Sequence, residues 1–263
     1  MLAAPAWLRN LAGAWVFYSI LPGFPQLQPR FDRIARFAPW IGLVIAGMQA
    51  MVWRILQSLG WPPLAMVLVV IIVAVWLTGG LHLDGVMDTA DGLAVAPDRR
   101  LDAMEDSRVG ASGVLALVAV LLLQVAALVS LAGQSLGLIP WALSAAAFWG
   151  RCSPLWAVLR FPYIKADGTA GFHSRHARGA REFVPSLVLL LTAAPLLWGM
   201  GHGLLVAQLC LIGSVTAALV AEVLGCRLGG HTGDSYGAAV VWTETFTLLL
   251  LALSLPWLVP SAV

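Results

Sequence analysis

Long apolar stretches separated by short polar connections dominate the chain from about residue 39 onward. A helix needs about 20 apolar residues to cross the hydrocarbon core of a bilayer. Seven windows approach that length, at approximately 39–56, 63–79, 111–132, 138–150, 184–200, 204–225 and 238–258. The fourth window reaches spanning length only if its helix extends toward Leu159. The pattern predicts an all-α, polytopic membrane helical bundle with about seven transmembrane helices.

A shorter apolar stretch precedes these windows and runs from Trp7 to Leu21. It ends in Pro22-Gly23-Phe24-Pro25, which favours a helix lying at the membrane interface. No internal repeat or low-complexity tract divides the sequence, so residues 1–263 are predicted to form a single membrane domain. The composition agrees, because 60% hydrophobic and 11% charged residues fall outside the range of soluble globular domains.

Charge is distributed unevenly over the polar connections. If the windows alternate in direction, fourteen of the 15 Lys and Arg residues lie on one side and only Arg54 on the other. The positive-inside rule then places the N-terminus in the cytoplasm of a multi-pass protein of the bacterial inner membrane. All 13 Asp and Glu residues fall on the same side. A transporter usually carries such groups near the bilayer midplane, so a divalent-cation transporter is the less favoured reading.

Seven of the acids lie within 81–107. Asp84, Asp88 and Asp91 follow the spacing i, i+4, i+7, which puts three carboxylates on one face of a helix that continues the second window. After Pro97, Asp102 and Asp106 repeat the i, i+4 spacing and predict a second short acidic helix.

Stacked carboxylates at a rim of low dielectric repel one another unless they neutralise a cation. Hard oxygen ligands favour Mg²⁺, with Mn²⁺ as a substitute, and one or two ions would suit the site. The alternative is a solvated acidic loop, but the helical register and the neighbouring Gly85 and Gly92 favour a site. The predicted metal ligands are Asp84, Asp88, Asp91, Asp102 and Asp106, and the predicted catalytic residues are Asp84, Asp88, Asp91 and Asp106.

Further polar residues lie beside apolar helix ends and are candidates for substrate binding. The long basic loop after the fourth window suits an anionic ligand, although it would equally serve as a positive-inside anchor. An ionisable residue inside an apolar helix is a functional candidate by default. The predicted substrate-binding residues are His82, Arg151, Tyr163, Lys165, Asp234 and Glu244.

Four segments, taken together, resemble one enzyme family. They are G-G-L-H-L-D-G-V-M-D-T-A-D-G-L, L-D-A-M-E-D-S-R-V-G-A-S-G, Y-I-K-A-D-G and G-G-H-T-G-D-S-Y-G-A. In this order they are similar to cobalamin synthase, also called adenosylcobinamide-GDP ribazoletransferase. The likeness runs from about Phe17 to Leu250, and Lys165 stands where the family commonly has arginine.

The resemblance implies a reaction. In it, the ribose hydroxyl of α-ribazole, or of its 5′-phosphate, attacks the cobinamide-side phosphorus of adenosylcobinamide-GDP, and GMP leaves. Magnesium is the implied cofactor. The expected partners are these small-molecule substrates and the lipid bilayer, with no nucleic acid, and the oligomeric state is left open.

A weaker resemblance is to the CDP-alcohol phosphotransferases, which act on phospholipid head groups through D-x-x-D-G and D-x-x-x-D motifs. Asp88 and Asp91 with Gly92 match the first motif, and Asp102 with Asp106 the second. The spacing between the halves is shorter here, and the Ala-Arg pair of that family is missing after Gly92. Membership of this family is therefore the alternative hypothesis for an enzyme function.

Overall fold

The computed structural model describes residues 4–165, 168 and 170–254. Its α-helices are α1 (Ala6–Tyr18), α2 (Ala38–Ser58), α3 (Pro63–Leu77), α4 (Leu81–Leu93), α5 (Arg100–Glu105), α6 (Ala111–Gln134), α7 (Leu138–Arg160), α8 (Gly171–His176), α9 (Val184–Leu197), α10 (Gly203–Leu228) and α11 (Gly233–Ser254). The all-α prediction is therefore confirmed. The last predicted window reaches beyond the described residues, which end at Ser254.

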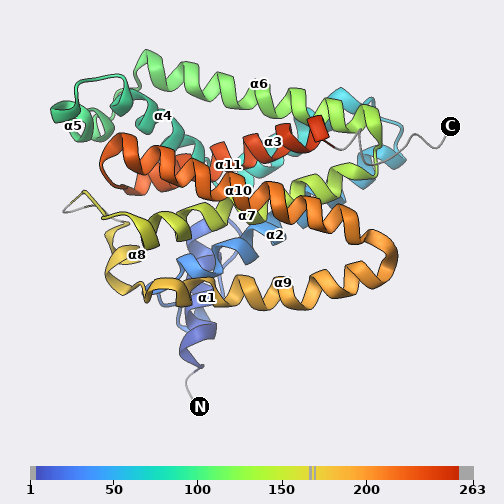
Figure 1. The fold of residues 1–263 in the computed structure, drawn as a ribbon, viewed down its shortest axis with the longest axis horizontal. Coiled ribbons are helices and arrows are strands. Elements are labelled where there is room, and N and C mark those ends of the chain that lie inside the picture. Colours follow the sequence, from blue (N-terminus) through green and yellow to red (C-terminus); the bar gives the residue numbers. More distant parts are fainter. Residues whose placement is uncertain (1–3, 166–167, 169, 255–263) are drawn as a thin grey trace.

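Four helical segments are long and apolar enough to cross a membrane, namely Ala35–Ser58, Ala111–Gln134, Gly179–Leu228 and Gly233–Ser254. The number rises to five if α3 and α4 are taken as one bent span, so the predicted count of seven is not established. The longest segment contains α9 and α10, which turn back on each other at Gly201, where φ is 90° (Figure 1). Helix α7 continues to Arg160, as the fourth window required.

Helices α7 and α11 form the centre of the bundle. Helix α11 packs against α4, α6, α7 and α10, and α7 packs against α2 as well. Alanines at 145–147 of α7 are buried at these contacts together with larger aliphatic side chains. Small residues allow membrane helices to approach closely, which explains why α7 combines low hydropathy with deep burial.

The acidic helix α4 does not continue α3, contrary to the sequence prediction. The two helices meet at an angle of 88°. Gly79 and Gly80 both have left-handed backbone angles, with φ of 62° and 75°, which glycine adopts at little cost and which ends α3. As a result α4, 13 residues long, runs at a steep angle to α3 instead of extending it.

Close backbone contact fixes α4 in that position. A side chain at Gly85 would collide with the carbonyl oxygen of Asp234, and one at Gly92 would collide with Met104 of α5. The sequence analysis assigned these glycines to close approach of a substrate or of another backbone. In the structure the neighbours are the first turn of α11 and the side chain of Met104.

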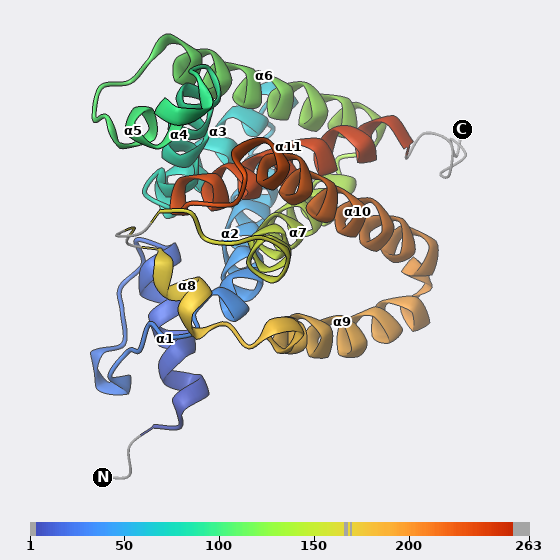
Figure 2. The ribbon, with the colours of Figure 1, turned by 60° about the vertical axis from the view of Figure 1, so that its left-hand side comes forward.

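The polar segments gather at one end of the bundle. Figure 1 shows α5, α8 and the first turn of α11 at the same end, opposite the turn between α9 and α10. Figure 2, turned by 60°, shows α4 and α5 together beside the beginning of α11. Most of the acidic connections thus meet in space. Helix α1 forms as expected, and its interfacial location stays a prediction.

Candidate active site

Three carboxylates of α4 form the centre of the candidate site. Asp84 is exposed, whereas Asp88 and Asp91 are half-buried. Among the described residues, the carboxylates of Asp84 and Asp88 have no hydrogen bond or ion pair. Burial, followed by the charges of Asp84, Asp234 and Asp91, raises the pKa of Asp88 to about 6, and Lys165 opposes this shift. The acids therefore repel one another and attract a cation.

Asp91 is also part of the fold. Its two oxygens accept hydrogen bonds from the backbone amides of Gly110, at 2.7 Å, and Gly113, at 2.8 Å. A carboxylate at these positions satisfies free amides at the N-terminus of α6 and interacts favourably with the helix dipole. Each oxygen keeps a second lone pair, so this contact and metal binding are compatible.

The prediction of a second acidic helix was wrong at Asp106. Helix α5 ends at Glu105, and Asp106 has extended backbone angles. Its carboxylate accepts hydrogen bonds from Nε of Arg108 at 3.0 Å and from Nη2 at 2.6 Å, which lowers the pKa of Asp106 to about 2. Asp102 remains on α5 and exposed. Asp106 lies past the end of α5, so Asp102 and Asp106 do not share a helical face.

The basic loop and the last polar loop are joined by an isolated β-bridge between Tyr163 and His231. The amide of Ile164 donates to the carbonyl of His231 at 2.9 Å, and the amide of His231 donates to that of Pro162 at the same distance. This bridge brings two predicted binding residues, Tyr163 and Lys165, beside α11. The motif containing them continues through residues 166 and 167, outside the described residues.

Lys165 lies between Glu105 of α5 and Asp234 of α11. Its Nζ is 3.4 Å from Oε1 of Glu105 and 4.0 Å from Oδ2 of Asp234. The structure therefore brings Lys165, Asp234 and the α4 acids to one place, although their positions in the sequence are far apart. Burial raises the pKa of Tyr163, so its hydroxyl is a hydrogen-bond donor at neutral pH.

The last polar loop holds α11 through contacts that the sequence analysis missed. The amide of Thr232 donates to Oγ of Ser235 at 2.8 Å, and the amide of Ser235 donates to Oγ1 of Thr232 at 3.1 Å. His231 is fully buried, 3.0 Å from Ser235 Oγ and stacked on Tyr236. The sequence T-G-D-S at 232–235 resembles a capping box, and this resemblance is the signal from which the contacts could have been predicted.

Two of the hollows beside α4 border its acidic residues. One, of about 380 Å³ and here called the polar hollow, has five charged residues in its lining: Asp91, Arg99, Asp102, Asp106 and Arg108. The other, of about 700 Å³, borders Asp84 and is mainly apolar, with Phe17, Leu83, Met87 and Leu117 among its lining residues. The sequence analysis had counted Arg99 and Arg108 only as topological charges. Their place beside the acids makes them candidates for binding an anion.

The donor chemistry of this site fits a hard divalent cation, because all the candidate ligands are carboxylate oxygens that repel one another. Within the described ranges, no group of three or more His, Cys, Asp or Glu side chains lies close enough to hold a metal ion. The predicted five-residue ligand set is thus not assembled as a closed cluster. The Mg²⁺ site stays a prediction.

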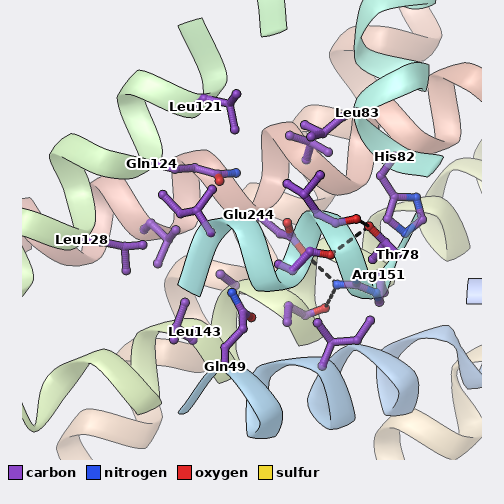
Figure 3. A pocket seen from close by; sticks show the side chains of 18 residues that line it. Gln49, Thr78, His82, Leu83, Leu121, Gln124, Leu128, Leu143, Arg151 and Glu244 are labelled. Carbon is purple, nitrogen blue, oxygen red and sulfur yellow. Dashed lines mark hydrogen bonds and ion pairs between the residues drawn. The ribbon is translucent and has the colours of Figure 1, made fainter. Parts of the chain in front are cut away.

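Three other predicted substrate-binding residues, His82, Arg151 and Glu244, lie deeper in the bundle than Tyr163, Lys165 and Asp234. Arg151 is only 3% exposed, and its Nη1 donates a hydrogen bond of 2.6 Å to Oε1 of Glu244. His82, at the beginning of α4, is also buried. All three line a small cavity behind α4 rather than the polar hollow (Figure 3).

Comparison with known proteins bears on what this site does. A family model described as cobalamin-5-phosphate synthase matches residues 10–252. The adenosylcobinamide-GDP ribazoletransferase of Prochlorococcus marinus strain MIT 9313 is 56% identical over 265 residues, covering 97% of this chain and 99% of that protein. No solved structure matches the chain.

More distant relatives carry the same name. The adenosylcobinamide-GDP ribazoletransferase of Thermosynechococcus vestitus is 44% identical over 241 residues, which cover 90% of this chain and 93% of that protein. The adenosylcobinamide-GDP ribazoletransferase of Trichormus variabilis is 40% identical over 250 residues, which cover 94% of this chain and 97% of that protein. The resemblance seen in the four motifs is confirmed, and the chain belongs to the cobalamin-5-phosphate synthase family of transferases.

Proposed function

We propose that this chain is a membrane transferase that joins adenosylcobinamide-GDP to α-ribazole, or to α-ribazole 5′-phosphate, and releases GMP. The product is adenosylcobalamin or its 5′-phosphate, so the reaction is the last assembly step of the nucleotide loop. The observation that carries the proposal is the group of uncompensated carboxylates on α4, flanked by a polar and an apolar hollow, in a chain whose relatives carry this activity in their name.

An alcohol that displaces a nucleotide from phosphorus needs positioning and charge stabilisation more than a covalent intermediate. Mg²⁺ would bind at the α4 acids Asp84, Asp88 and Asp91, with Asp102 nearby on α5. The diphosphate of the substrate would supply the remaining ligands, because no three acidic side chains of the described residues lie close enough to hold an ion alone. When bound, the ion would neutralise negative charge on the diphosphate. Asp91 would hold its position through the amides of α6. Asp106 would act indirectly, by orienting the guanidinium of Arg108.

Cationic side chains around the acids would bind the phosphates. Arg99 and Arg108 face the polar hollow, and Lys165 lies on the side of α5 and α11. Asp84 borders the apolar hollow, whose aromatic and aliphatic walls suit the benzimidazole of α-ribazole. Asp84 would orient the attacking ribose hydroxyl and accept its proton.

The proposal includes a location in the bacterial inner membrane with the N-terminus and the polar end in the cytoplasm. The support is the charge asymmetry of the loops and the gathering of acidic segments at one end of the bundle (Figure 1). A cysteine introduced at the exposed position 98, in a chain whose exposed Cys226 is replaced, should react with an impermeant reagent only from the cytoplasmic side. Labelling from the outside would reverse the proposed topology.

Product analysis tests the proposed reaction. Purified protein in nanodiscs is incubated with adenosylcobinamide-GDP, α-ribazole and Mg²⁺, and nucleotides and cobamides are separated by chromatography. Equal amounts of GMP and adenosylcobalamin are expected, and replacing α-ribazole by its 5′-phosphate tests the phosphorylated acceptor. Absence of GMP, together with CMP release from a CDP-alcohol and an alcohol acceptor, would favour the alternative enzyme family.

A further inference from the structure

A partly open cavity with several polar lining residues lies between the helices of the bundle, behind α4. Its volume is about 60 Å³, and it lies between α2, α3, α4, α6, α7 and α11 (Figure 3). Most of its walls are aliphatic, but six polar or charged side chains also line it. They are Gln49, Thr78, His82, Gln124, Arg151 and Glu244. So many polar groups around one small space are unusual in an apolar bundle.

Two glycines make room for the ion pair at this cavity. A Cβ at Gly42 of α2 would lie 2.5 Å from the carbonyl oxygen of Ala147 and 2.7 Å from Cδ of Arg151. A Cβ at Gly150 of α7 would lie 2.6 Å from Cγ of Glu244. Two helices therefore lack side chains where Arg151 and Glu244 pass, which indicates a site built for this pair.

Polar atoms at the cavity are left without protein partners. Nε of Arg151 and Nε2 of His82 are buried and make no hydrogen bond among the described residues. The two residues are 3% and 8% exposed. A buried polar atom without a partner is costly, and ordered water is the usual remedy where space permits. About 15 Å³ holds one water, so this cavity has room for a small cluster.

We propose that the cavity is a hydration site through which the Arg151–Glu244 pair positions α4. Water that enters beside Nε of Arg151 and Nε2 of His82 would bridge the two side chains; this requires a small local opening, because each atom has almost no accessible surface. His82 stands two residues before Asp84, so the bridge fixes the first turn of the acidic helix. Arg151 and Glu244 are then positioning residues. This role rests on the proposed function, because it assumes that the acids on α4 perform the reaction.

Hydration can be tested without any substrate. Brief radiolysis in H₂¹⁸O labels side chains that touch bound water, and mass spectrometry locates the label. Leu128 and Leu131 make a matched pair, since both are buried on α6 but only Leu128 lines the cavity. We expect ¹⁸O at Leu128 and none at Leu131. Absence of label at Leu128, or equal label at both, would overturn the hydration site whether or not the protein is active.

The positioning role needs a kinetic test. The double variant Arg151→Gln/Glu244→Gln removes both charges, which avoids leaving one buried charge uncompensated. Because a small misplacement of catalytic groups is costly, kcat should fall roughly 10- to 100-fold while KM changes little. Arg151→Lys, which keeps the charge, should recover part of kcat.

The control is Arg33→Gln/Glu182→Gln, which removes another largely buried ion pair, far from the cavity lining. This variant should retain wild-type kcat in the folded fraction. An unchanged kcat in the cavity variant, or an equal fall in both variants, would overturn the positioning role. If the wild-type protein releases no GMP, the proposed function fails instead, and the ¹⁸O experiment still decides the hydration site.

Discussion

Two carboxylates of this protein, Glu182 and Asp88, have opposite surroundings. Glu182 is buried and accepts hydrogen bonds from the guanidinium of Arg33 and, at 3.0 Å, from the amide of Arg178. Asp88 is half-buried among other acids, and within the described residues its side chain has no donor. The difference separates an acid that stabilises the fold from one kept at an energetic cost.

The cost at Asp88 is electrostatic. Desolvation and the charges of Asp84, Asp234 and Asp91 all raise its pKa, and the one cation in that balance is Lys165. Glu182, in contrast, has hydrogen-bond donors from Arg33 and Arg178 that replace the water lost on burial. Residues that break local energetic rules without compensation tend to lie at functional sites. The comparison therefore supports the proposed functional role of Asp88 and a structural role of Glu182.

The largest expected effect is the loss of turnover in Asp88→Asn and in Asp84→Asn. Each change removes a charge that the proposed metal requires, so GMP release should fall by about 10²–10³-fold or more. Asp88→Asn should leave the protein folded, since it also removes repulsion. Steady-state assays at saturating Mg²⁺ measure the effect, and wild-type turnover in either variant would exclude that residue from the site.

Lys165→Ala should have the next largest effect on activity. Lys165 lies near Glu105 and Asp234, where its ammonium would hold a substrate phosphate as a point charge. Loss of this contact should cost about 1.5–3 kcal/mol, or tenfold or more in kcat/KM. Lys165→Arg is the matched control and should stay active. Wild-type kcat/KM of Lys165→Ala for both substrates would reduce Lys165 to a topological anchor.

Glu182→Gln should give the reverse result of Asp88→Asn. The change leaves Arg33 with a weaker partner and should lower the free energy of unfolding by about 1–3 kcal/mol. Thermal unfolding in detergent measures this loss. The kcat of the folded fraction should match the wild type, and a large fall in kcat with unchanged stability would contradict the comparison.

Asp91 should show both effects, because its carboxylate joins α4 to the N-terminus of α6. Asp91→Ala should destabilise the protein by about 1 kcal/mol through loss of this cap, in addition to losing turnover. Asp84→Ala has no such contact among the described residues and serves as the control. Equal unfolding temperatures for the two variants would show that the cap adds nothing to stability.

The smallest expected effect depends on pH. Burial lowers the pKa of His173 to about 4, whereas an unfolded histidine has a pKa of about 6.5. The unfolded state therefore binds more protons below pH 6.5, and stability falls as the pH drops toward 4. Between pH 7 and pH 6, His173 should account for about 0.7 kcal/mol. The free energy of unfolding is measured against pH for the wild type and for His173→Phe, and the difference between them removes the contribution of the other titrating groups. Identical pH profiles for the two proteins would contradict the contribution assigned to His173.

Local patterns in the sequence account for much of the fold and of the site. Apolar windows predicted the helices, and the i, i+4, i+7 spacing placed Asp84, Asp88 and Asp91 on one helix. Local spacing was misleading at Asp106, which lies past the end of α5 and pairs with Arg108 instead of continuing the helix. The bend at Gly79 and Gly80 was missed because two glycines alone do not set an angle between helices.

Contacts between distant residues were beyond the reach of local patterns. Arg151 and Glu244 were singled out for their chemistry, but their pairing across 93 positions depends on the packing of α7 against α11. The bridge between Tyr163 and His231 likewise requires two loops to meet. Arg99 lies in none of the four family segments, and Arg108 lies in the second of them without having been singled out. Only the fold showed that both line the hollow beside the acids.

Cation binding tests the central claim most directly. Mn²⁺, as a substitute for Mg²⁺, is titrated into purified protein with adenosylcobinamide-GDP, and the free ion is followed by its electron paramagnetic resonance signal. Wild-type protein and Glu182→Gln should bind Mn²⁺ equally, whereas Asp88→Asn should bind at least roughly tenfold more weakly. Equal binding by wild type and Asp88→Asn would contradict the assignment of the α4 acids to a cation-dependent active site.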